Sequence, residues 1–310
     1  MGLGFLFPGQ GAQRVGMIGD IEAAEPAVAR RFEEASEAVG FDLAETIRHG
    51  PPERLNSTEI TQPALVAVGV ALLDAWCRRG GAEPEVVAGH SLGEYSALVA
   101  AGALEFAAAI ALVHERGKLM QDAVPAGQGA MAAILGLGDD EVAECCEGID
   151  GTVSPANYNS PGQVVIAGST AAVAAAIDVC KARGARRAVP LDVSVPSHCA
   201  LMAPASEPLA ELLRSADIRD PRIPVVQNHT ATAATDSATI RENLVHQLTS
   251  PVRWSESVGA MAVAGVGTFV ESGPGNVLAG LARRIDRSLR VHGIGTLDGL
   301  LAAIEATRDE

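Results

Sequence analysis

Aromatic side chains and positive charge are both scarce in this sequence. Phe, Trp and Tyr make up 3% of the 310 residues and hydrophobic residues 48%, so a core must be built mainly from Leu, Val, Ile and Ala. The formal net charge is −15, which argues against a general nucleic-acid binder because such a protein needs a basic surface. The same charge repels acidic partners, so an acidic partner can dock only on a local basic patch.

Signals for disulfides, metal binding, export and membrane insertion are missing as well. The cysteines are odd in number and lack the spacing of a disulfide framework or a zinc site. Residues 1–7 are apolar, but they have no charged start and turn at Pro8-Gly9, which predicts a first strand and no signal peptide. No run reaches the roughly 18 apolar residues of a membrane span. We therefore expect a cytoplasmic protein with reduced thiols, no metal site and no membrane association. The thiols are Cys77, Cys145, Cys146, Cys180 and Cys199.

The order of apolar runs and helical patterns indicates an α/β fold with two domains. The first part predicts strands over 3–7 and 86–88 and helices over 61–79, 91–101 and 104–124, and later strands are predicted over 224–227 and 268–271. The middle predicts strands over 130–137, 152–157, 163–168 and 187–193, with helices over 139–147 and 171–183. The order of these middle elements, β-α-β-β-α-β, is that of a ferredoxin-like unit. We expect such a small domain at 125–194, inserted into a larger α/β domain formed by 1–124 and 195–310.

The pentapeptide Gly89-His90-Ser91-Leu92-Gly93 matches Gly-x-Ser-x-Gly, the pattern of a serine nucleophile on a sharp turn between a strand and a helix. A side chain at either flanking position would clash in such a turn, and glycine removes the clash. The following helix points its N-terminal N–H groups at the site, which favours developing negative charge. A serine that only caps a helix after a glycine turn gives the same pattern, so the motif alone leaves both interpretations open.

A serine hydroxyl needs a base to activate it, and the chain has seven histidines. His198 follows Val195-Pro196-Ser197, where we expect a strand to end and a helix to begin. His90 adjoins Ser91, so we expect its side chain to point elsewhere. Spacing alone does not select His198 from the other histidines, and Cys199 beside it is an alternative nucleophile.

Arg116 lies in the middle of an apolar helical stripe. At 100° per residue, all the stripe residues fall within about 60° of it; they are Ala109, Leu112, Val113, Leu119, Met120 and Ala123. The opposite side holds His114, Lys118, Gln121 and Asp122. A buried guanidinium is costly unless a carboxylate pairs with it, and its planar fork can bind a carboxylate at two points. That carboxylate belongs either to an internal salt bridge or to a substrate whose acyl group ends in a carboxylate.

Several further segments match one family in order along nearly the whole chain. They are residues 7–13, 61–65, 89–97, 129–133, 159–164, 194–202, 251–254 and 273–275. On these motifs the sequence resembles bacterial malonyl-CoA:acyl carrier protein transacylases. The resemblance implies an α/β-hydrolase-like body with a ferredoxin-like insertion.

The resemblance also implies roles for matched positions. Ser91 is expected to be the nucleophile and His198 the general base and acid. Arg116 is expected to hold the malonyl carboxylate. Gln10 and Leu92 are expected to stabilise the oxyanion through their backbone N–H groups, and Gln10 also to contact the substrate.

The implied reaction transfers malonate from malonyl-CoA to the phosphopantetheine thiol of an acyl carrier protein, through a malonyl-serine, for fatty acid elongation. The backbone carbonyl of Gln247 is expected to hold the ring N–H of His198 in place of the usual Asp. No permanently bound cofactor, metal or nucleic acid is implied, and we expect a monomer. The residue Leu92 after the serine and the Val-Pro-Ser before His198 resemble malonyl-selective members more than methylmalonyl-selective ones.

Docking of an acidic carrier protein requires a basic patch, and the sequence offers two clusters. One is Lys181, Arg183, Arg186 and Arg187, and the other is Arg283, Arg284 and Arg287. We expect one of them to border the mouth of the site and to meet the carrier protein or the phosphates of coenzyme A. A solvated helix face would explain either cluster equally well.

Other functions share some of these sequence features. The same chemistry serves a trans-acting malonyltransferase of polyketide synthesis. An esterase or thioesterase of the α/β-hydrolase class shares Gly-x-Ser-x-Gly but normally has an Asp or Glu before a late His, and it leaves Arg116 unexplained. A nucleotide-binding module is suggested only by Gly9-Gln10-Gly11, which lacks the required glycine spacing. A carrier-protein binder without activity would not need Ser91, His198 and Arg116 together.

Overall fold

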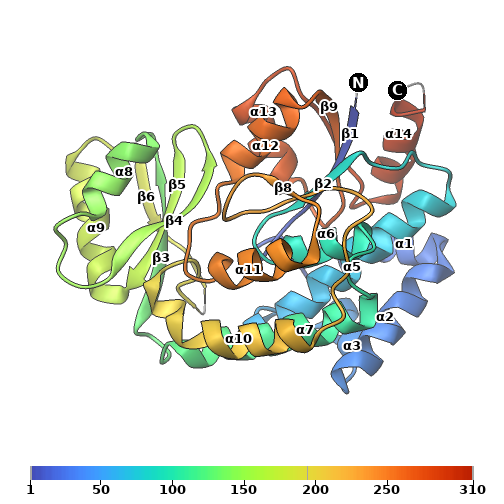
Figure 1. Cartoon of the computed structure of the whole chain (residues 1–310), viewed down its shortest axis with the longest axis horizontal. Helices are drawn as coiled ribbons and strands as arrows, with labels where there is room; N and C mark the ends of the chain where they lie inside the picture. Colours follow the sequence, from blue (N-terminus) through green and yellow to red (C-terminus); the bar gives the residue numbers. More distant parts are fainter. Residues whose placement is uncertain (1, 194, 309–310) are drawn as a thin grey trace.

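The structure, a computed structural model, describes residues 2–193 and 195–308. Its strands form two separate sheets (Figure 1). The larger sheet has the order β10 (Arg290–Gly293), β9 (Val266–Glu271), β1 (Gly2–Phe7), β2 (Val86–Gly89), β7 (Val225–Val226) and β8 (Ala233–Ala234). The smaller sheet has the order β4 (Val153–Ser160), β5 (Gln163–Ser169), β3 (Gly129–Leu135) and β6 (Arg187–Pro190). The predicted mixed α/β organisation is confirmed.

Strand β1 lies inside the larger sheet, between β2 and β9, and pairs with both in parallel. Only the β7–β8 pair is antiparallel among the described pairings of this sheet. Successive side chains of a strand point to opposite faces. Phe5 and Phe7 therefore join one apolar cluster, while Leu6 joins another. A parallel sheet of this kind needs helices on both faces.

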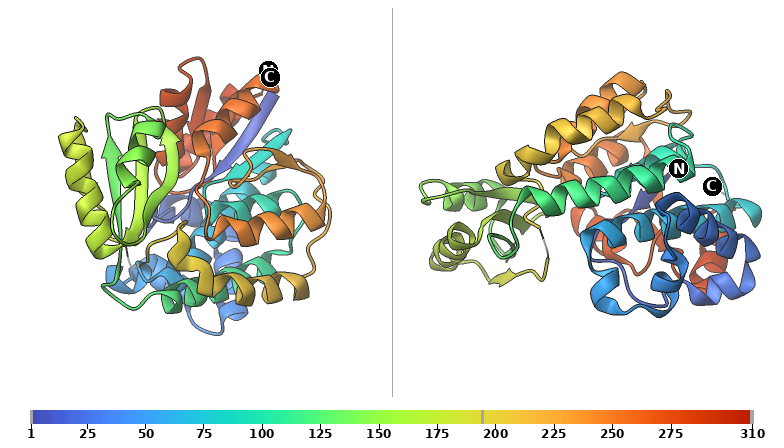
Figure 2. Two further views of the ribbon diagram at one scale, coloured as in Figure 1. Left: turned by 60° about the vertical axis from the view of Figure 1, so that its left-hand side comes forward. Right: turned by 90° about the horizontal axis from the view of Figure 1, so that it is seen from below.

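Two groups of helices cover these faces (Figures 1 and 2). The Leu6 face is covered by α12 (Trp254–Val263) and α13 (Val277–Ile285). The helices that contribute to the Phe5 and Phe7 cluster are α1 (Gly19–Ala24), α2 (Pro26–Val39), α3 (Leu43–His49), α4 (Pro52–Leu55), α5 (Thr58–Arg78), α6 (Gly93–Ala100), α7 (Phe106–Ala123), α10 (Ala203–Ser215), α11 (Ser237–Gln247) and α14 (Leu297–Ala306). The three helices predicted in the first part of the chain correspond to α5, α6 and α7.

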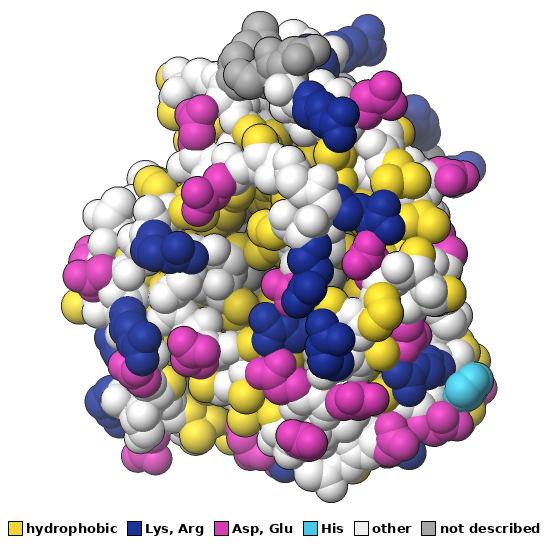
Figure 3. All heavy atoms as spheres, turned by 90° about the vertical axis from the view of Figure 1, so that its right-hand side faces the viewer, with side chains coloured by type: hydrophobic (Ala, Val, Ile, Leu, Met, Phe, Trp, Pro, Cys, Tyr) yellow, Lys and Arg dark blue, Asp and Glu magenta, His cyan; other side chains and the backbone are white. Residues whose placement is uncertain are grey.

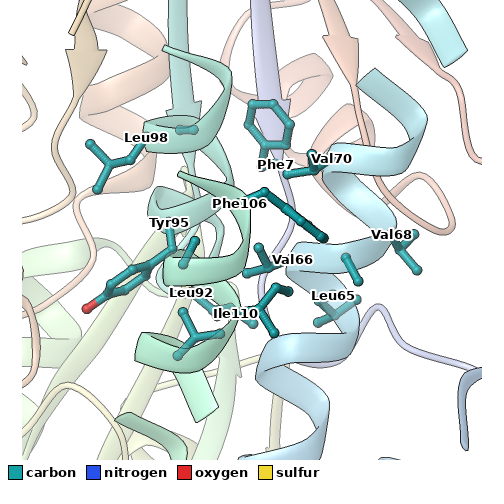
Figure 4. Packing of buried hydrophobic residues seen from close by; sticks show 14 of the residues in the cluster. Phe7, Leu65, Val66, Val68, Val70, Leu92, Tyr95, Leu98, Phe106 and Ile110 are labelled. Carbon is teal, nitrogen blue, oxygen red and sulfur yellow. The ribbon is translucent and has the colours of Figure 1, made fainter. Parts of the chain in front are cut away.

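Helix α5 is the central helix of the larger cluster. Figure 4 shows its Leu65, Val66 and Val70 packed beside Phe7 and Ile110. It is also long and apolar enough to cross a membrane, with a mean hydropathy of 1.5 over its most apolar window, but 83% of that window is buried inside the fold. No uninterrupted apolar run marks this helix in the sequence, because polar residues interrupt it. Burial on this scale is typical of a core helix.

The smaller sheet and two helices form the second unit, which stands to one side of the larger body in Figure 2. All of its strand pairings are antiparallel. Helices α8 (Asp139–Cys146) and α9 (Thr170–Ala182) share one apolar cluster with the sheet, which includes Ile134, Ile166 and Val173. Its elements follow the chain in the predicted order, β-α-β-β-α-β.

Two predicted boundaries in this unit are wrong. The strand predicted over 187–193 ends at Pro190, which has no N–H group to donate to a sheet. The strand predicted over 152–157 continues to Ser160, so only Pro161-Gly162 remain for the turn, where Gly162 takes a left-handed φ of 72°. The predicted domain boundary at residue 194 lies outside the described residues, as do the chain ends at 1 and 310.

The face of the larger body that lies on the right of Figure 1 carries mixed charge. Figure 3 shows Lys and Arg side chains interspersed with Asp and Glu on this face. Ion pairs join α1 to α3 through Arg48–Glu22 and α2 to α5 through Arg31–Asp74, each at 2.6 Å. Basic groups here are thus partnered by acidic ones within the protein.

Candidate active site

Ser91 lies on the turn between β2 and α6, at the carboxyl end of a parallel strand. Its φ of 52° is in the left-handed region, which a residue with a side chain adopts only at a cost. His198 has a similar φ of 62°. Backbone strain of this kind is concentrated at functional sites, and here it occurs at both residues that the sequence singled out.

The two glycines of the motif are required by close backbone contacts. A Cβ atom on Gly89 would lie 1.8 Å from the carbonyl carbon of Gly93, and one on Gly93 would lie 2.0 Å from the carbonyl oxygen of Phe7. Neither contact is possible for a real side chain. The glycines therefore let β1, β2 and the start of α6 meet closely enough to hold Ser91 at the sheet edge.

His198 meets Ser91 although 107 residues separate them in the chain. Its Nε2 lies 2.7 Å from Ser91 Oγ, and its Nδ1 lies 2.7 Å from the backbone carbonyl oxygen of Gln247. A carbonyl oxygen can only accept, so Nδ1 carries the proton and Nε2 is free to accept one. The expected position at the end of a strand is wrong, because β6 ends at Pro190 and His198 lies in a loop before the 3₁₀ turn Ala200–Met202.

The imidazole of His198 is held in its neutral form. Burial, together with the nearby charge of Arg116, lowers the pKa of His198 to about 3. A neutral imidazole in contact with a hydroxyl can remove its proton as the oxygen attacks an electrophile. The arrangement is therefore that of an activated serine.

Two side chains that the sequence did not single out also hold Ser91. The side chain of Asn228 accepts from the Ser91 N–H at 2.5 Å and donates to the Gly89 carbonyl at 2.6 Å. Glu94 accepts from the backbone N–H of Asn228 at 3.0 Å and from the side-chain amide of Gln247. Asn228 lies in a loop without a periodic pattern, so no sequence signal marked it. Glu94 had a weak one, since it is a lone acid among apolar residues in α6.

Arg116 is buried in α7, as predicted, with 1% of its surface exposed. Its Nη1 donates to Gln62 Oε1 at 2.8 Å and its Nη2 to Gln247 Oε1 at 2.9 Å. Among the described residues no carboxylate lies within ion-pair distance, and its Nε has no hydrogen-bond partner. The internal salt bridge is therefore not formed. On the opposite side of the helix His114 is also buried, with Nδ1 2.8 Å from the Glu59 carbonyl, so that side is less exposed than predicted.

A pocket of about 390 Å³ opens at Ser91 between the two sheets. Its walls come from the loop after β1, which includes Gln10, from the small unit and from α13. His90 also lines it, with Nε2 2.8 Å from Asn159 Oδ1. His198 lines the pocket, whereas Leu92, Gln247 and Arg116 do not. Arg116 lies behind the wall and is joined to the site through Gln247.

The expected oxyanion donors are the backbone N–H groups of Gln10, which lines the pocket, and of Leu92, which directly follows Ser91. Neither forms a hydrogen bond within the described part of the chain. Leu92 precedes the first turn of α6, where N–H groups lack partners within the helix. Two free N–H groups beside a nucleophile can bind an oxygen that becomes negative.

The remaining reactive groups do not extend the site. Cys199 is fully buried, its Sγ donates to the Pro196 carbonyl at 3.1 Å, and burial raises the pKa of its thiol. All five cysteines are free. No group of three or more metal-binding side chains occurs among the residues that the structure describes.

A serine hydroxyl beside a buried neutral imidazole, on a strained turn before a helix, is the arrangement of enzymes that carry an acyl group on serine. The family model of the acyl transferase domain matches residues 4–293. The chain thus belongs to the acyl transferase family and, within it, to the malonyl CoA-acyl carrier protein transacylases. This confirms the resemblance read from the motifs.

Relatives with that name match over nearly their whole length. The chain is 52% identical to the transacylase of Escherichia coli K12, over 97% of this chain and 98% of that protein. It is 43% identical to that of Bacillus subtilis 168, over 99% and 98%.

Solved structures of malonyl transacylases are also similar to this chain over nearly their whole length. The transacylase from Coxiella burnetii has a TM-score of 0.97 at 44% identity, over 99% of this chain and 98% of that one. The malonyl-transacylase PlMCAT, in complex with its type II PKS acyl-carrier protein AntF, has a TM-score of 0.97 at 48% identity, over 99% and 100%.

Proposed function

We propose that this protein transfers the malonyl group of malonyl-CoA to the phosphopantetheine thiol of an acyl carrier protein, for fatty acid elongation. The observation that carries the proposal is the 2.7 Å contact between Ser91 Oγ and His198 Nε2, in a chain 52% identical to a named malonyl CoA-acyl carrier protein transacylase. No permanently bound cofactor takes part, because serine and imidazole supply the chemistry.

The reaction runs in two similar halves. His198 Nε2 removes the Ser91 proton as Oγ attacks the thioester carbonyl carbon, and the amides of Gln10 and Leu92 bind the oxyanion. The carbon–sulfur bond then breaks, and the coenzyme A sulfur takes the proton from His198. In the second half the carrier thiol gives its proton to His198 and its sulfur attacks the malonyl ester. The bond between the carbonyl carbon and Ser91 Oγ then breaks, and Oγ takes the proton back from His198. The Gln247 carbonyl keeps His198 in the tautomer that both halves need.

Arg116 is proposed to bind the malonyl carboxylate. Its Nη1 and Nη2 each donate to a glutamine amide, and its buried Nε has no partner. Nε and the second N–H of Nη2 form a side-on fork that can take a carboxylate at two points. Because Arg116 lies behind the pocket wall, the carboxylate must pass Gln247 to reach it. Water cannot pair with the guanidinium as strongly, so an acyl group without a carboxylate loses this interaction.

The finer description of the fold is also a proposal. The larger parallel sheet, with Ser91 on the turn after a strand, supports an α/β-hydrolase-like domain of 1–124 and 195–310. The order β4-β5-β3-β6 with antiparallel neighbours supports a ferredoxin-like domain at 125–194. The free cysteines are consistent with a cytoplasmic location.

The carrier protein is proposed to dock beside α13. Val277, Leu278 and Leu281 of this helix line the pocket, and Arg284 donates to the pocket-lining Gln163 at 2.5 Å. Arg284 therefore borders the mouth. The other basic cluster runs from Lys181 at the end of α9 to Arg187, the first residue of β6, whereas from there the chain reaches the pocket only after β6, at Leu191. Arg183 in this cluster pairs with Glu144.

Charge reversal tests this choice between clusters. Arg284→Glu should raise the apparent KM for carrier protein about three- to tenfold while malonyl loading from malonyl-CoA is unchanged, because a rim charge acts mainly on association. Arg186→Glu with Arg187→Glu is the matched variant. A larger rise in KM from that pair would move the docking site to the small unit.

One second function has a specific observation in its favour. The solved complex of PlMCAT contains a carrier protein of type II PKS, so the same chemistry also serves polyketide synthesis. Comparing transfer rates to a fatty acid carrier and to a polyketide carrier separates the two. An esterase or thioesterase would release free malonate faster than it loads either carrier.

Intact mass spectrometry tests the reaction directly. Mixing the protein with malonyl-CoA should add one malonyl group, and Ser91→Ala should abolish the adduct. Acetyl-CoA should label the protein far less. Equal labelling by the two donors would contradict the role of Arg116, and labelling of Ser91→Ala would contradict the nucleophile.

A further inference from the structure

Glu94 is a fully enclosed carboxylate one residue into α6, with 1% of its surface exposed. A carboxylate is rarely buried unless its oxygens are fully engaged. Both oxygens of Glu94 accept hydrogen bonds, from Asn228 and from Gln247. Burial raises the pKa of Glu94, but the groups that donate to its two oxygens and the charge of Arg116 favour the carboxylate form.

One oxygen controls the backbone around the nucleophile. Oε1 accepts from the backbone N–H of Asn228, and the Asn228 side chain joins the Ser91 N–H to the Gly89 carbonyl. These two backbone groups flank His90, directly before the left-handed residue Ser91. Asn228 therefore holds the backbone that leads into the strained turn at Ser91.

The other oxygen controls the base and the arginine. Oε2 accepts from the side-chain amide of Gln247, which also donates to the Ser91 carbonyl at 3.0 Å. The same residue accepts from Arg116 through Oε1 at 2.9 Å and from His198 through its backbone carbonyl at 2.7 Å. Gln247 thus contacts three groups of the reaction, and Glu94 fixes the direction of its amide.

We propose that Glu94 is a positioning residue that joins two clamps. One clamp is Asn228, which holds the backbone at the nucleophile Ser91, and the other is Gln247, which holds the base His198 and Arg116. Glu94 touches no reacting atom. By accepting at both oxygens, it keeps Asn228 and Gln247 in the one arrangement that aligns Ser91, His198 and the acyl-carboxylate donor. This inference rests on the proposed malonyl transfer.

The isosteric change Glu94→Gln distinguishes a role in hydrogen bonding from a role in packing alone, because it keeps the size of the side chain. A glutamine has one accepting oxygen and one donating NH₂ group. Whichever way the amide turns, its NH₂ faces the N–H of Asn228 or the NH₂ of Gln247, and one clamp loses its acceptor. A misplacement of about 1 Å at a reacting group can cost about 10²-fold in rate.

The experiment compares wild type, Glu94→Gln, Asn228→Ala and the double variant. Single-turnover malonyl loading of Ser91 and steady-state transfer are measured for each, with thermal melting to confirm folding. We expect Glu94→Gln and Asn228→Ala each to lower kcat about 10²-fold, with KM for malonyl-CoA changed less than threefold. We expect the double variant to lose at least fivefold less than the product of the single losses, because contacting residues are coupled.

A matched control is Glu271→Gln, another buried carboxylate that accepts two backbone N–H groups, those of Leu278 and Ala279. It should lower the melting temperature comparably but reduce kcat less than the Glu94 change does. If Glu94→Gln does not fold, Asn228→Ala still tests the clamp: loading within threefold of wild type would overturn the proposal. Strictly multiplicative losses, or a folded Glu94→Gln with wild-type kcat, would overturn it too. Absence of malonyl loading in wild type would instead contradict the proposed function.

Discussion

The Ser91 end and the Arg116 end of the buried polar network are built differently. At Ser91 the N–H, the carbonyl and the hydroxyl each have a partner: Asn228, Gln247 and His198 respectively. At Arg116 the guanidinium donates to two neutral amides, and its buried Nε has no partner within the described part of the chain. Tyr95 beside it also has a buried hydroxyl without a partner of good geometry, and Figure 4 shows this hydroxyl pointing away from α5.

The difference shows which end is complete before substrate arrives. Hydrogen bonds that are already aligned need no reorganisation during the reaction, so the nucleophile end is preorganised. The arginine end retains unused donors in a place where an unpaired donor is costly. We infer that the Arg116 end gives up some stability in order to bind the substrate carboxylate. The Ser91 end, in contrast, is held rigid for the acyl transfer.

The largest expected effect comes from disrupting the turn that holds Ser91. Gly93→Ala places a Cβ atom 2.0 Å from the Phe7 carbonyl oxygen, so α6 must move away from β1. We expect the free energy of unfolding to fall by about 3 kcal/mol or more and malonyl loading to be lost. Urea unfolding and mass spectrometry measure the two effects. Gly259→Ala in α12 is the control, since a Cβ there meets nothing within 4 Å and should stabilise the helix by up to about 1 kcal/mol.

The second-largest expected effect comes from removing the guanidinium group at the Arg116 end. Arg116→Ala should lower malonyl transfer by about 10²–10³-fold, because removing one partner of a buried charge pair costs several kcal/mol. Acetyl transfer should fall less than tenfold, so the selectivity between donors should collapse. Steady-state rates with malonyl-CoA and acetyl-CoA measure this ratio. Arg214→Ala, at an exposed arginine paired with Glu207, should leave both rates unchanged, and an equal loss for both donors at Arg116 would refute the comparison.

The smallest expected effect is that of pH on malonyl loading at the Ser91 end. With a pKa of about 3, His198 stays neutral, so malonyl loading should show no His198-dependent decline between pH 8 and pH 5. The folded-state pKa lies below the ordinary 6.5, so the contribution of His198 to stability is fully present above pH 6.5. It is lost as pH falls toward 3. The contribution of Glu94 to stability has the opposite sign: because burial raises its pKa, this contribution is lost as pH rises from 4.5 through the folded-state pKa.

Single-turnover loading and urea unfolding across this pH range measure both effects. An acidic limb in the loading rate with a midpoint near 6.5, absent from the unfolding curve, would show that the imidazole is exposed to solvent during the reaction. The two ends of the site would then differ less than the hydrogen bonds indicate.

Local features of the fold and site were predictable because their causes are local. The glycines around Ser91 are needed by contacts within one turn, and the apolar stripe of α7 follows the helical period, so the motif and the burial of Arg116 were readable. Contacts across the chain were not. Spacing alone did not select His198, which meets Ser91 from 107 residues away, and only the family resemblance did.

The residues and boundaries that the sequence did not predict correctly also have physical explanations. Asn228 lies in a loop, where no period reveals the direction of a side chain. Pro190 ended a strand that the apolar pattern extended to 193, because a missing N–H outweighs β-propensity. The internal salt bridge considered for Arg116 is absent from the described residues, because glutamine amides accept its hydrogen bonds instead.

The pairing of β3 with β6 has a consequence for the way the chain reaches this site. Ser91 and His198 lie on either side of the small unit in the sequence, and Ala132 pairs with Pro190 across its sheet. With that sheet formed, the pair bridges 190 − 132 = 58 residues, about half of the 107-residue separation. Each halving of a loop saves only about 0.6 kcal/mol of closure entropy, so the native state gains little. The consequence is spatial: the sheet of the small unit turns the chain back, so that His198 can meet a serine whose turn depends on its own glycines.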